Sequence, residues 1–194
     1  MCRIMKVNEI FYSIQGEGRW TGTPCVFIRF SGCNLMCEFC DTDHHLYHEY
    51  SIKELVNAIT EYPAKHVVFT GGEPTLQVTD DLCKPLKAKG YYLHIETNGT
   101  RKVCAKVDRI TCSPKLPSVV PTRINEIKVV CTEQDTDASL KQWNAIEADE
   151  YYLQPCDTGD RIRNNKILKK CVKWILKNPK WKLSLQTHKL INVR

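Results

Sequence analysis

The feature that most constrains this chain is a regular alternation of short β-rich runs with helical patterns. Seven runs enriched in β-branched and aromatic residues lie at 25–31, 66–70, 91–97, 107–112, 126–131, 151–154 and 181–186. Strands separated by helices form right-handed βαβ units, whose strands run parallel in one sheet. The alternation therefore predicts an α/β fold, which is either a doubly wound sheet or an incomplete (β/α) barrel.

Helical signals fill several intervals between these runs. Ser51 and Glu54 make a capping-box pattern at the start of an apolar face at positions 52, 55, 56 and 59. Further helices are predicted over 77–89, 137–148 and 160–177. Pro85 is expected to kink or end the first of these three, because proline lacks the N–H of an internal helical hydrogen bond.

Unusual residues follow or close the predicted strands. They are Cys33, Gly71, Asn98, Ser113 and Gln154. In both candidate folds the loops at the carboxyl ends of the strands form the ligand site. We therefore expect a single site that is built from these loops.

The size and composition fit one ordinary domain, 1–194, since no repeat or linker marks a boundary. The first residues lack the apolar core of a signal peptide, and no apolar run approaches the ~20 residues of a membrane span. A cytoplasmic protein without a membrane partner is expected. The formal charge of +6 is spread along the chain, apart from a basic stretch at 161–173 that is typical of a helix surface. No nucleic-acid partner is expected.

Cys33, Cys37 and Cys40 place three thiols on one short loop after a predicted strand. Eleven cysteines without a secretory signal indicate reduced thiols or a metal site rather than disulfides. Three soft ligands suit iron–sulfur or zinc, and a cluster held by three cysteines would leave one iron open. The alternatives are a zinc site completed by His44 or His45, or simply buried cysteines. The other cysteines are scattered and are predicted to lie in the core: Cys2, Cys25, Cys83, Cys104, Cys112, Cys131, Cys156 and Cys171.

The cysteine loop is followed by Gly71-Gly72-Glu73-Pro74, and together the two motifs resemble the radical S-adenosylmethionine (SAM) superfamily. The resemblance implies an incomplete (β/α) barrel of the radical SAM type and a 4Fe-4S cluster on the three cysteines. The open iron would bind the methionine part of SAM, with Phe39 near the adenine. The two glycines would let the backbone approach a ligand closely, because they lack a Cβ. On its own, the Gly-Gly-Glu-Pro segment is also compatible with a simple turn.

Further motifs narrow the resemblance. They are Phe-Tyr-Ser-Ile-Gln-Gly-Glu-Gly at 11–18, Cys-Asp-Thr at 40–42, Glu-Thr-Asn-Gly at 96–99, Ser-Pro-Lys at 113–115, Gln-Pro at 154–155 and Gln-x-His-Lys at 186–189. In this order they resemble the 7-carboxy-7-deazaguanine synthase family, over about residues 11–189.

This resemblance implies a lyase of queuosine biosynthesis that converts 6-carboxy-5,6,7,8-tetrahydropterin into 7-carboxy-7-deazaguanine with loss of ammonia. A 5′-deoxyadenosyl radical made from SAM would take hydrogen from C6 of the pterin and later return it, so no side chain performs the abstraction. An electron-donating reductase and a homodimer are also implied.

The resemblance assigns substrate binding to seven positions: Gln15, Gly16, Glu17, Arg29, Thr70, His188 and Arg194. It assigns SAM binding to Phe39, Gly72, Ser113, Pro114, Lys115, Gln154 and Asp157. Thr42 would help to hold a Mg2+ ion, and the alternative for it is a turn or cap hydroxyl.

Residue chemistry supports part of this set independently. A pterin offers an amino-pyrimidine donor edge and a carboxylate, for which Glu17 is a suitable acceptor and Arg29 a suitable donor. Strand alternation puts Arg29 on the inner face with Phe27, while Val26, Ile28 and Phe30 face the helices. The alternatives are a structural ion pair for Arg29 and a solvated turn for Glu17 and Gln15.

The segment after His188 is short, and Leu190–Arg194 in extended form reach at most ~18 Å. The terminal carboxylate is therefore expected either to fold back over the site and accept from the donor edge of the pterin, or to fray. Two other functions remain open at this stage. They are a glycyl-radical activating enzyme, against which the Gln-Gly-Glu-Gly and Ser-Pro-Lys motifs argue, and a non-catalytic iron–sulfur or zinc protein.

Overall fold

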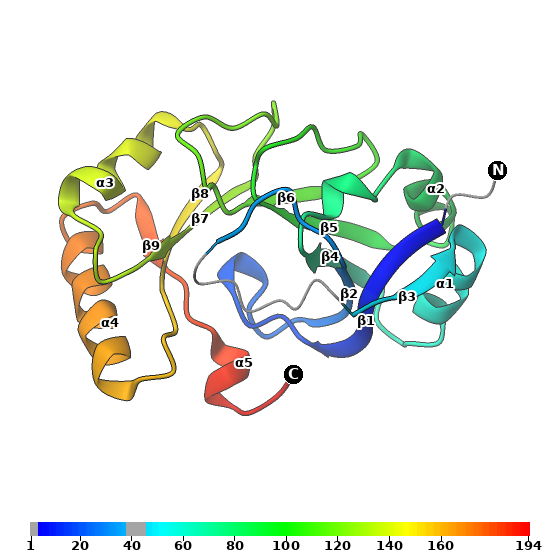
Figure 1. Ribbon diagram of the computed structural model, residues 1–194, viewed down its shortest axis with the longest axis horizontal. Coiled ribbons are helices and arrows are strands. Elements are labelled where there is room, and N and C mark those ends of the chain that lie inside the picture. Colours follow the sequence, from blue (N-terminus) through cyan, green and yellow to red (C-terminus); the bar gives the residue numbers. More distant parts are fainter. Residues whose placement is uncertain (1–3, 38–45) are drawn as a thin grey trace.

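The computed structural model describes residues 4–37 and 46–194, and Figure 1 shows a curved sheet with helices at its two ends. Nine strands in the described residues form one sheet in the order β3-β1-β2-β4-β5-β6-β7-β8-β9. The strands are β1 (Ile4–Ile14), β2 (Pro24–Phe30), β3 (His48–Ser51), β4 (His66–Gly71), β5 (Tyr92–Thr97), β6 (Arg109–Cys112), β7 (Glu126–Cys131), β8 (Glu150–Pro155) and β9 (Trp181–Leu183).

The order of the strands decides between the two predicted folds. The parallel part of the sheet consists of β2 and β4 to β9, and these strands lie side by side in their order along the chain. The order of strands in a doubly wound sheet would reverse part-way, whereas the order of these parallel strands does not. The structure is therefore an incomplete (β/α) barrel, since β3 and β9 are the two edges of the sheet.

All seven predicted strands are confirmed, although β9 ends at Leu183 instead of residue 186. Two further strands, β1 and β3, were not predicted; they pair antiparallel at one edge of the sheet. Residues 187–190 form the short helix α5 (Thr187–Leu190) rather than the end of a strand.

The predicted helices occur with shifted ends. They are α1 (Ile52–Thr60), α2 (Asp80–Ala88), α3 (Asp137–Lys141) and α4 (Arg161–Ile175). The capping box of Ser51 and Glu54 is present at the start of α1. Pro85 lies inside α2 and does not end it, since the helix continues to Ala88. The segment ahead of α2 instead forms a 3-10 turn, Pro74–Leu76, and α3 passes into another, Gln142–Ala145.

The outer face of the sheet carries most of the buried apolar residues. Val26, Ile28 and Phe30 pack in one core with α1 and α2, and Ile127 and Val129 pack in a second core with α4. The inner face is more polar, because alternate positions of the same strands hold Arg29, Thr70, Glu96, Lys128 and Gln154. This division leaves the polar face lining the barrel interior. None of the described helices is long and apolar enough to cross a bilayer.

Replacing the cap serine of α1 tests the local energetics. Ser51→Ala removes the acceptor for the backbone N–H of Glu54 and should lower the free energy of unfolding by about 1 kcal/mol. The measurement is denaturant unfolding followed by circular dichroism. Ser118→Ala is the matched control at an exposed loop position, and an equal loss in both variants would contradict a capping role.

Candidate active site

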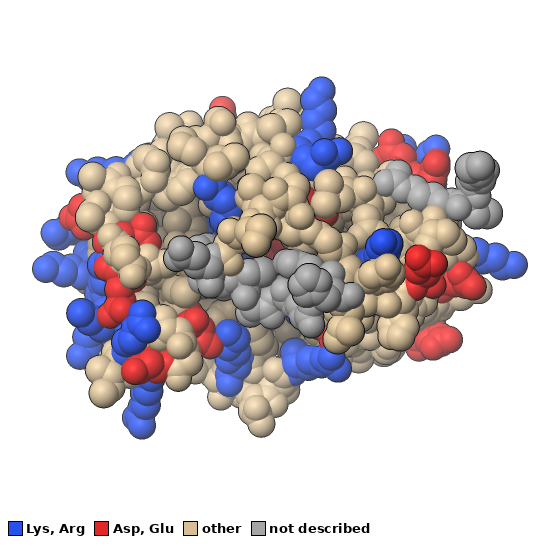
Figure 2. Space-filling model, viewed as in Figure 1, with Lys and Arg blue, Asp and Glu red and all other residues tan. Residues whose placement is uncertain are grey.

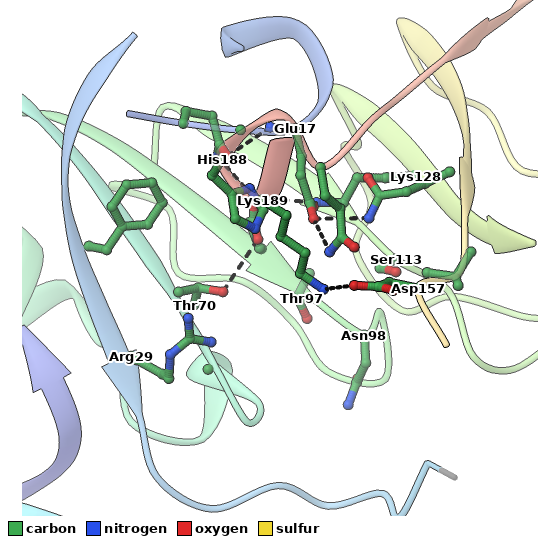
Figure 3. A pocket seen from close by; sticks show the side chains of 18 of the residues that line it. Glu17, Arg29, Thr70, Thr97, Asn98, Ser113, Lys128, Asp157, His188 and Lys189 are labelled. Carbon is green, nitrogen blue, oxygen red and sulfur yellow. Dashed lines mark hydrogen bonds and ion pairs between the residues drawn. The ribbon is translucent and has the colours of Figure 1, made fainter. Parts of the chain in front are cut away.

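A cavity of about 320 Å³ lies at the carboxyl ends of the parallel strands. All seven substrate positions predicted from the sequence line it: Gln15, Gly16, Glu17, Arg29, Thr70, His188 and Arg194. Figure 3 shows several of these side chains turned toward one another from strands and loops that are far apart in the sequence. The fold thus brings together residues from both halves of the chain.

Five of the seven predicted SAM positions also line the cavity: Gly72, Ser113, Lys115, Gln154 and Asp157. The Nζ of Lys115 donates to the Oγ of Ser113 at 2.9 Å. Asp157 accepts from Lys189 at 2.8 Å, and this bond, with those from the Gly159 N–H and Asn164, lowers the pKa of Asp157 to about 2. Pro114 is buried and is not a lining residue, and Phe39 lies outside the described residues.

Two of the three predicted cluster ligands lie at the cavity. Cys33 and Cys37 both line it, and the Sγ of Cys33 accepts from the backbone N–H of Leu35 at 3.4 Å. Cys40 and Thr42 fall outside the described residues, as do His44 and His45. Two partly accessible thiols on one loop at the cavity wall fit a cluster with an iron that faces the ligand.

The scattered cysteines largely confirm the prediction of a core role. Cys25, Cys83, Cys112, Cys131 and Cys171 are buried, and burial raises the pKa of Cys25 and of Cys112 to about 12. Such thiols are poor metal ligands, since only the thiolate binds.

Two scattered cysteines depart from that prediction. Cys104 is only partly buried, with its Sγ 3.6 Å from that of Cys83, and Cys156 lines the cavity because it directly follows β8. Cys2 lies outside the described residues.

The Gly-Gly-Glu-Pro segment holds the cluster loop in place. A Cβ on Gly72 would lie 2.0 Å from the carbonyl oxygen of Gly32, so only glycine fits beside the cysteine loop. Glu73 is fully buried; its N–H donates to that carbonyl at 3.0 Å, and its carboxylate accepts from Thr97 at 2.8 Å. Gly72 therefore permits a close contact with the backbone of the cysteine loop. Glu73 links its own loop to the loops that contain Gly32 and Thr97.

Gly16 and His188 are packed together. A Cβ on Gly16 would lie 2.0 Å from the Nδ1 of His188, so the missing side chain makes room for the imidazole. Thr187 donates through its backbone N–H and its hydroxyl to the carbonyl oxygen of Gly16, at 3.0 and 2.9 Å. These contacts fix α5 against the loop after β1.

Glu17 lies at the cavity with only 14% of its side chain exposed, and it is not the solvated turn that the sequence left open. Its Oε1 accepts from Gln154 at 2.9 Å and from Gln186 at 2.8 Å, and its Oε2 accepts from the ammonium of Lys128. Burial by itself would raise the pKa of Glu17, but the charge of Lys128 and the three donors outweigh it and lower the pKa to about 2. Glu17 is therefore a carboxylate at neutral pH.

Gln15 is also part of this network. Its Nε2 donates to Glu96 at 3.1 Å, and its Oε1 accepts from the backbone N–H of Glu17 at 3.1 Å. Thr70 donates to the other oxygen of Glu96 at 3.3 Å. The inner face thus carries two adjacent carboxylates.

Arg29 makes the ion pair that was its structural alternative, and it also lines the cavity. Its Nε donates to Glu9 at 2.8 Å, and Arg194 pairs with the same carboxylate. The two guanidinium groups also lie 5.8 and 5.4 Å from the centre of the Phe11 ring. The backbone of residues 190–194 is tied back, because the Val193 N–H donates to the His188 carbonyl at 2.9 Å.

Several lining residues have no role in the sequence analysis. Lys128 is the most important of these, since no sequence feature assigned it to the site. Glu96, Asn98 and Gln186 were noted only as members of motifs or at the ends of strands, without a role of their own. A signal for Lys128 was present, since Glu126 and Lys128 alternate with Ile127 and Val129 in a strand. Charged residues on one face of an interior strand must find partners.

The outer surface carries charge of both signs. In Figure 2, Lys and Arg side chains are interspersed with Asp and Glu, most densely at the end of the molecule where Figure 1 places α4. On α4, Arg163 pairs with Glu133 at 2.8 Å. The basic stretch at 161–173 is therefore a helix surface, as the sequence predicted.

Comparison with known proteins agrees with this geometry. The model of the radical SAM superfamily matches residues 27–119. The 7-carboxy-7-deazaguanine synthase of Bacteroides thetaiotaomicron is 47% identical over 190 residues, which cover 97% of this chain and 98% of that protein. The chain belongs to the 7-carboxy-7-deazaguanine synthase family.

Other members of the family match as completely. The Haemophilus influenzae synthase is 36% identical, over 96% of this chain and 93% of that protein. The crystal structure of QueE from Escherichia coli superposes with a TM-score of 0.78 at 29% identity, covering 94% and 93% of the two chains. These matches set aside the glycyl-radical activating enzyme and the non-catalytic iron–sulfur or zinc protein.

The cysteine assignment leads to a first test of the site. Cys33→Ala, Cys37→Ala and Cys40→Ala should each lose the visible iron–sulfur absorbance after anaerobic reconstitution, because each removes one of three ligands. Cys25→Ser and Cys112→Ser are the controls, since both thiols are buried with raised pKa values. Equal loss of iron in a control variant would contradict the assignment of three cluster ligands.

Proposed function

We propose that this chain is a radical SAM lyase that converts 6-carboxy-5,6,7,8-tetrahydropterin into 7-carboxy-7-deazaguanine with loss of ammonia, in queuosine biosynthesis. The observation that carries the proposal is that one cavity unites Cys33 and Cys37 with the residues of the other family motifs. Membership of the family supports the same reaction.

The charges of the cavity match the two ends of a carboxypterin. Glu17 and Glu96, which share Lys128, offer acceptors that suit the amino and N–H groups of the pyrimidine ring. Arg29 and Arg194, which share Glu9, bring guanidinium groups that suit the carboxylate. His188 and Thr70 lie at the same cavity and are proposed to bind the ring between the two ends.

When bound, the cluster and SAM would supply the radical chemistry at C6 of the pterin. The residues of the chain hold the reactants. We assign SAM contacts to Gly72, Ser113, Lys115, Gln154 and Asp157, which line the cavity, and to Phe39 and Pro114 from the family motif. Gln154 also donates to Glu17, so it would link the SAM and pterin ends of the cavity.

The remaining components are proposed from the family pattern. Thr42 would contribute one oxygen to a Mg2+ ion that retains waters and substrate oxygens. A low-potential reductase would deliver the electron, two copies would form a homodimer, and the enzyme would work in the cytoplasm, where free thiols persist. The described cysteines are all free thiols, which fits this compartment.

The deciding experiment is anaerobic reconstitution with iron and sulfide, followed by incubation with SAM, reductant and the carboxypterin, with and without magnesium. Formation of 7-carboxy-7-deazaguanine while SAM is not consumed is expected. Reductive SAM cleavage without this product would overturn the proposed substrate. If Thr42→Ala kept the full response to magnesium, Thr42 would be excluded as a ligand.

Removing residues 190–194 tests the part of the site that follows His188. The deletion loses the Val193–His188 hydrogen bond and the Arg194–Glu9 ion pair, so the KM for the carboxypterin should rise about tenfold. Cluster content and SAM affinity should stay the same, and Arg163→Ala on α4 is the surface control. Unchanged pterin kinetics would show that this segment plays no part.

A further inference from the structure

Lys128 is a buried ammonium group at the floor of the cavity, and neither the family motifs nor the reaction explains it. It lies in the middle of β7, and only 6% of its side chain is exposed. Lysine is almost never buried to this degree unless it is paired, because an isolated buried charge is costly. Its partners therefore indicate what it does.

The partners are the two carboxylates that face the substrate end of the cavity. The Nζ of Lys128 donates to the Oε2 of Glu17, and it lies 3.5 Å from the Oε1 of Glu96 (Figure 3 shows the Glu17 bond). Glu17 comes from the loop after β1, and Glu96 comes from β5. One ammonium thus sets the spacing of two carboxylates that belong to separate parts of the fold.

We propose that Lys128 is a positioning residue that keeps Glu17 charged and aimed, and thereby makes the pocket select the 2-amino group of the pyrimidine ring. The inference rests on the proposed function. Glu17 already accepts from Lys128, Gln154 and Gln186, and a carboxylate offers about four acceptor positions. One position remains for the substrate, and the three protein donors fix its direction.

The charges around Glu17 support this assignment. Burial raises the pKa of Glu17, and the charge of Lys128 is the largest of the causes that lower it. Without Lys128, burial would favour the protonated acid, which donates a proton where the amino group also donates. The charged and titratable groups that face this region are Lys128 and Glu126 on β7, Glu96 and His94 on β5, His188 and Lys189 on α5, and Asp157 after β8. His94 is buried and its pKa is held well below the ordinary value, so it adds no charge.

The test uses the reconstituted full-length protein with two non-reacting probes, 6-carboxypterin and its 2-oxo analogue 6-carboxylumazine. Wild type should prefer the amino compound. Lys128→Met should weaken 6-carboxypterin binding on the order of tenfold to a hundredfold and abolish the preference. The loss should be largest at low pH and narrow as pH rises, because Glu17 would then titrate. SAM affinity and iron content should not change.

Two further variants separate positioning from folding. Lys128→Arg keeps the charge and should recover most of the preference, whereas the exposed control Lys182→Met on β9 should behave as wild type. If Lys128→Met does not fold, Lys128→Gln also removes the charge while it keeps a polar side chain, and it should likewise lack the preference.

Retention of the amino preference within twofold in Lys128→Met, or in Lys128→Gln if only that variant folds, overturns the inference. A wild-type protein that binds neither probe and does not convert the carboxypterin overturns the proposed function instead. Wild-type turnover with an indifferent Lys128→Met variant leaves the function standing and removes only the role of Lys128.

Discussion

The loop between β1 and β2 carries the contacts on which the barrel and its site both depend. Within residues 4–37 and 46–194 the sheet does not close, so no backbone pairing there joins its two edges. The loop crosses the interior instead: Glu17 bonds Lys128 on β7, the Gly18 N–H donates to Ser184 at 3.0 Å, and Arg19 pairs with Glu150 at 2.8 Å. These bonds tie the first strands to the last ones.

The same crossing explains why the site needs glycine at two positions. Gly16 makes room for His188. Gly18 has a φ of +61°, and a Cβ at this position would lie 2.1 Å from the Oε1 of Glu126. A side chain at either position would push the loop away from its partners. The Gln-Gly-Glu-Gly motif is therefore a structural element whose central glutamate also lines the cavity.

Much of the fold could be predicted from the sequence, because parallel strands that are covered by helices leave strong local patterns. The seven parallel strands and the capped helix at Ile52–Thr60 are examples. β1 was missed since it mixes charged and apolar residues at the antiparallel edge, and β3 since it has only four residues. The site residues came from motifs rather than periodicity. The role of Lys128 was not predicted because its partners, Glu17 and Glu96, lie 111 and 32 positions away in the sequence. A local sequence pattern does not indicate contacts over such separations.

The contact between the loop at 15–17 and the segment at 186–188 also bears on folding kinetics. The Gln186–Glu17 and Thr187–Gly16 hydrogen bonds join residues 169 and 171 positions apart. Closing loops of this length reduces the conformational entropy of the chain before either bond forms. Contacts of such high sequence separation generally form late and slowly. The cysteine loop at 33–37 and Gly72, which packs against this loop, follow instead the neighbouring strands β2 and β4. A partly folded chain could thus present cluster thiols before it can recognise a pterin, which makes the pterin pocket a late product of assembly.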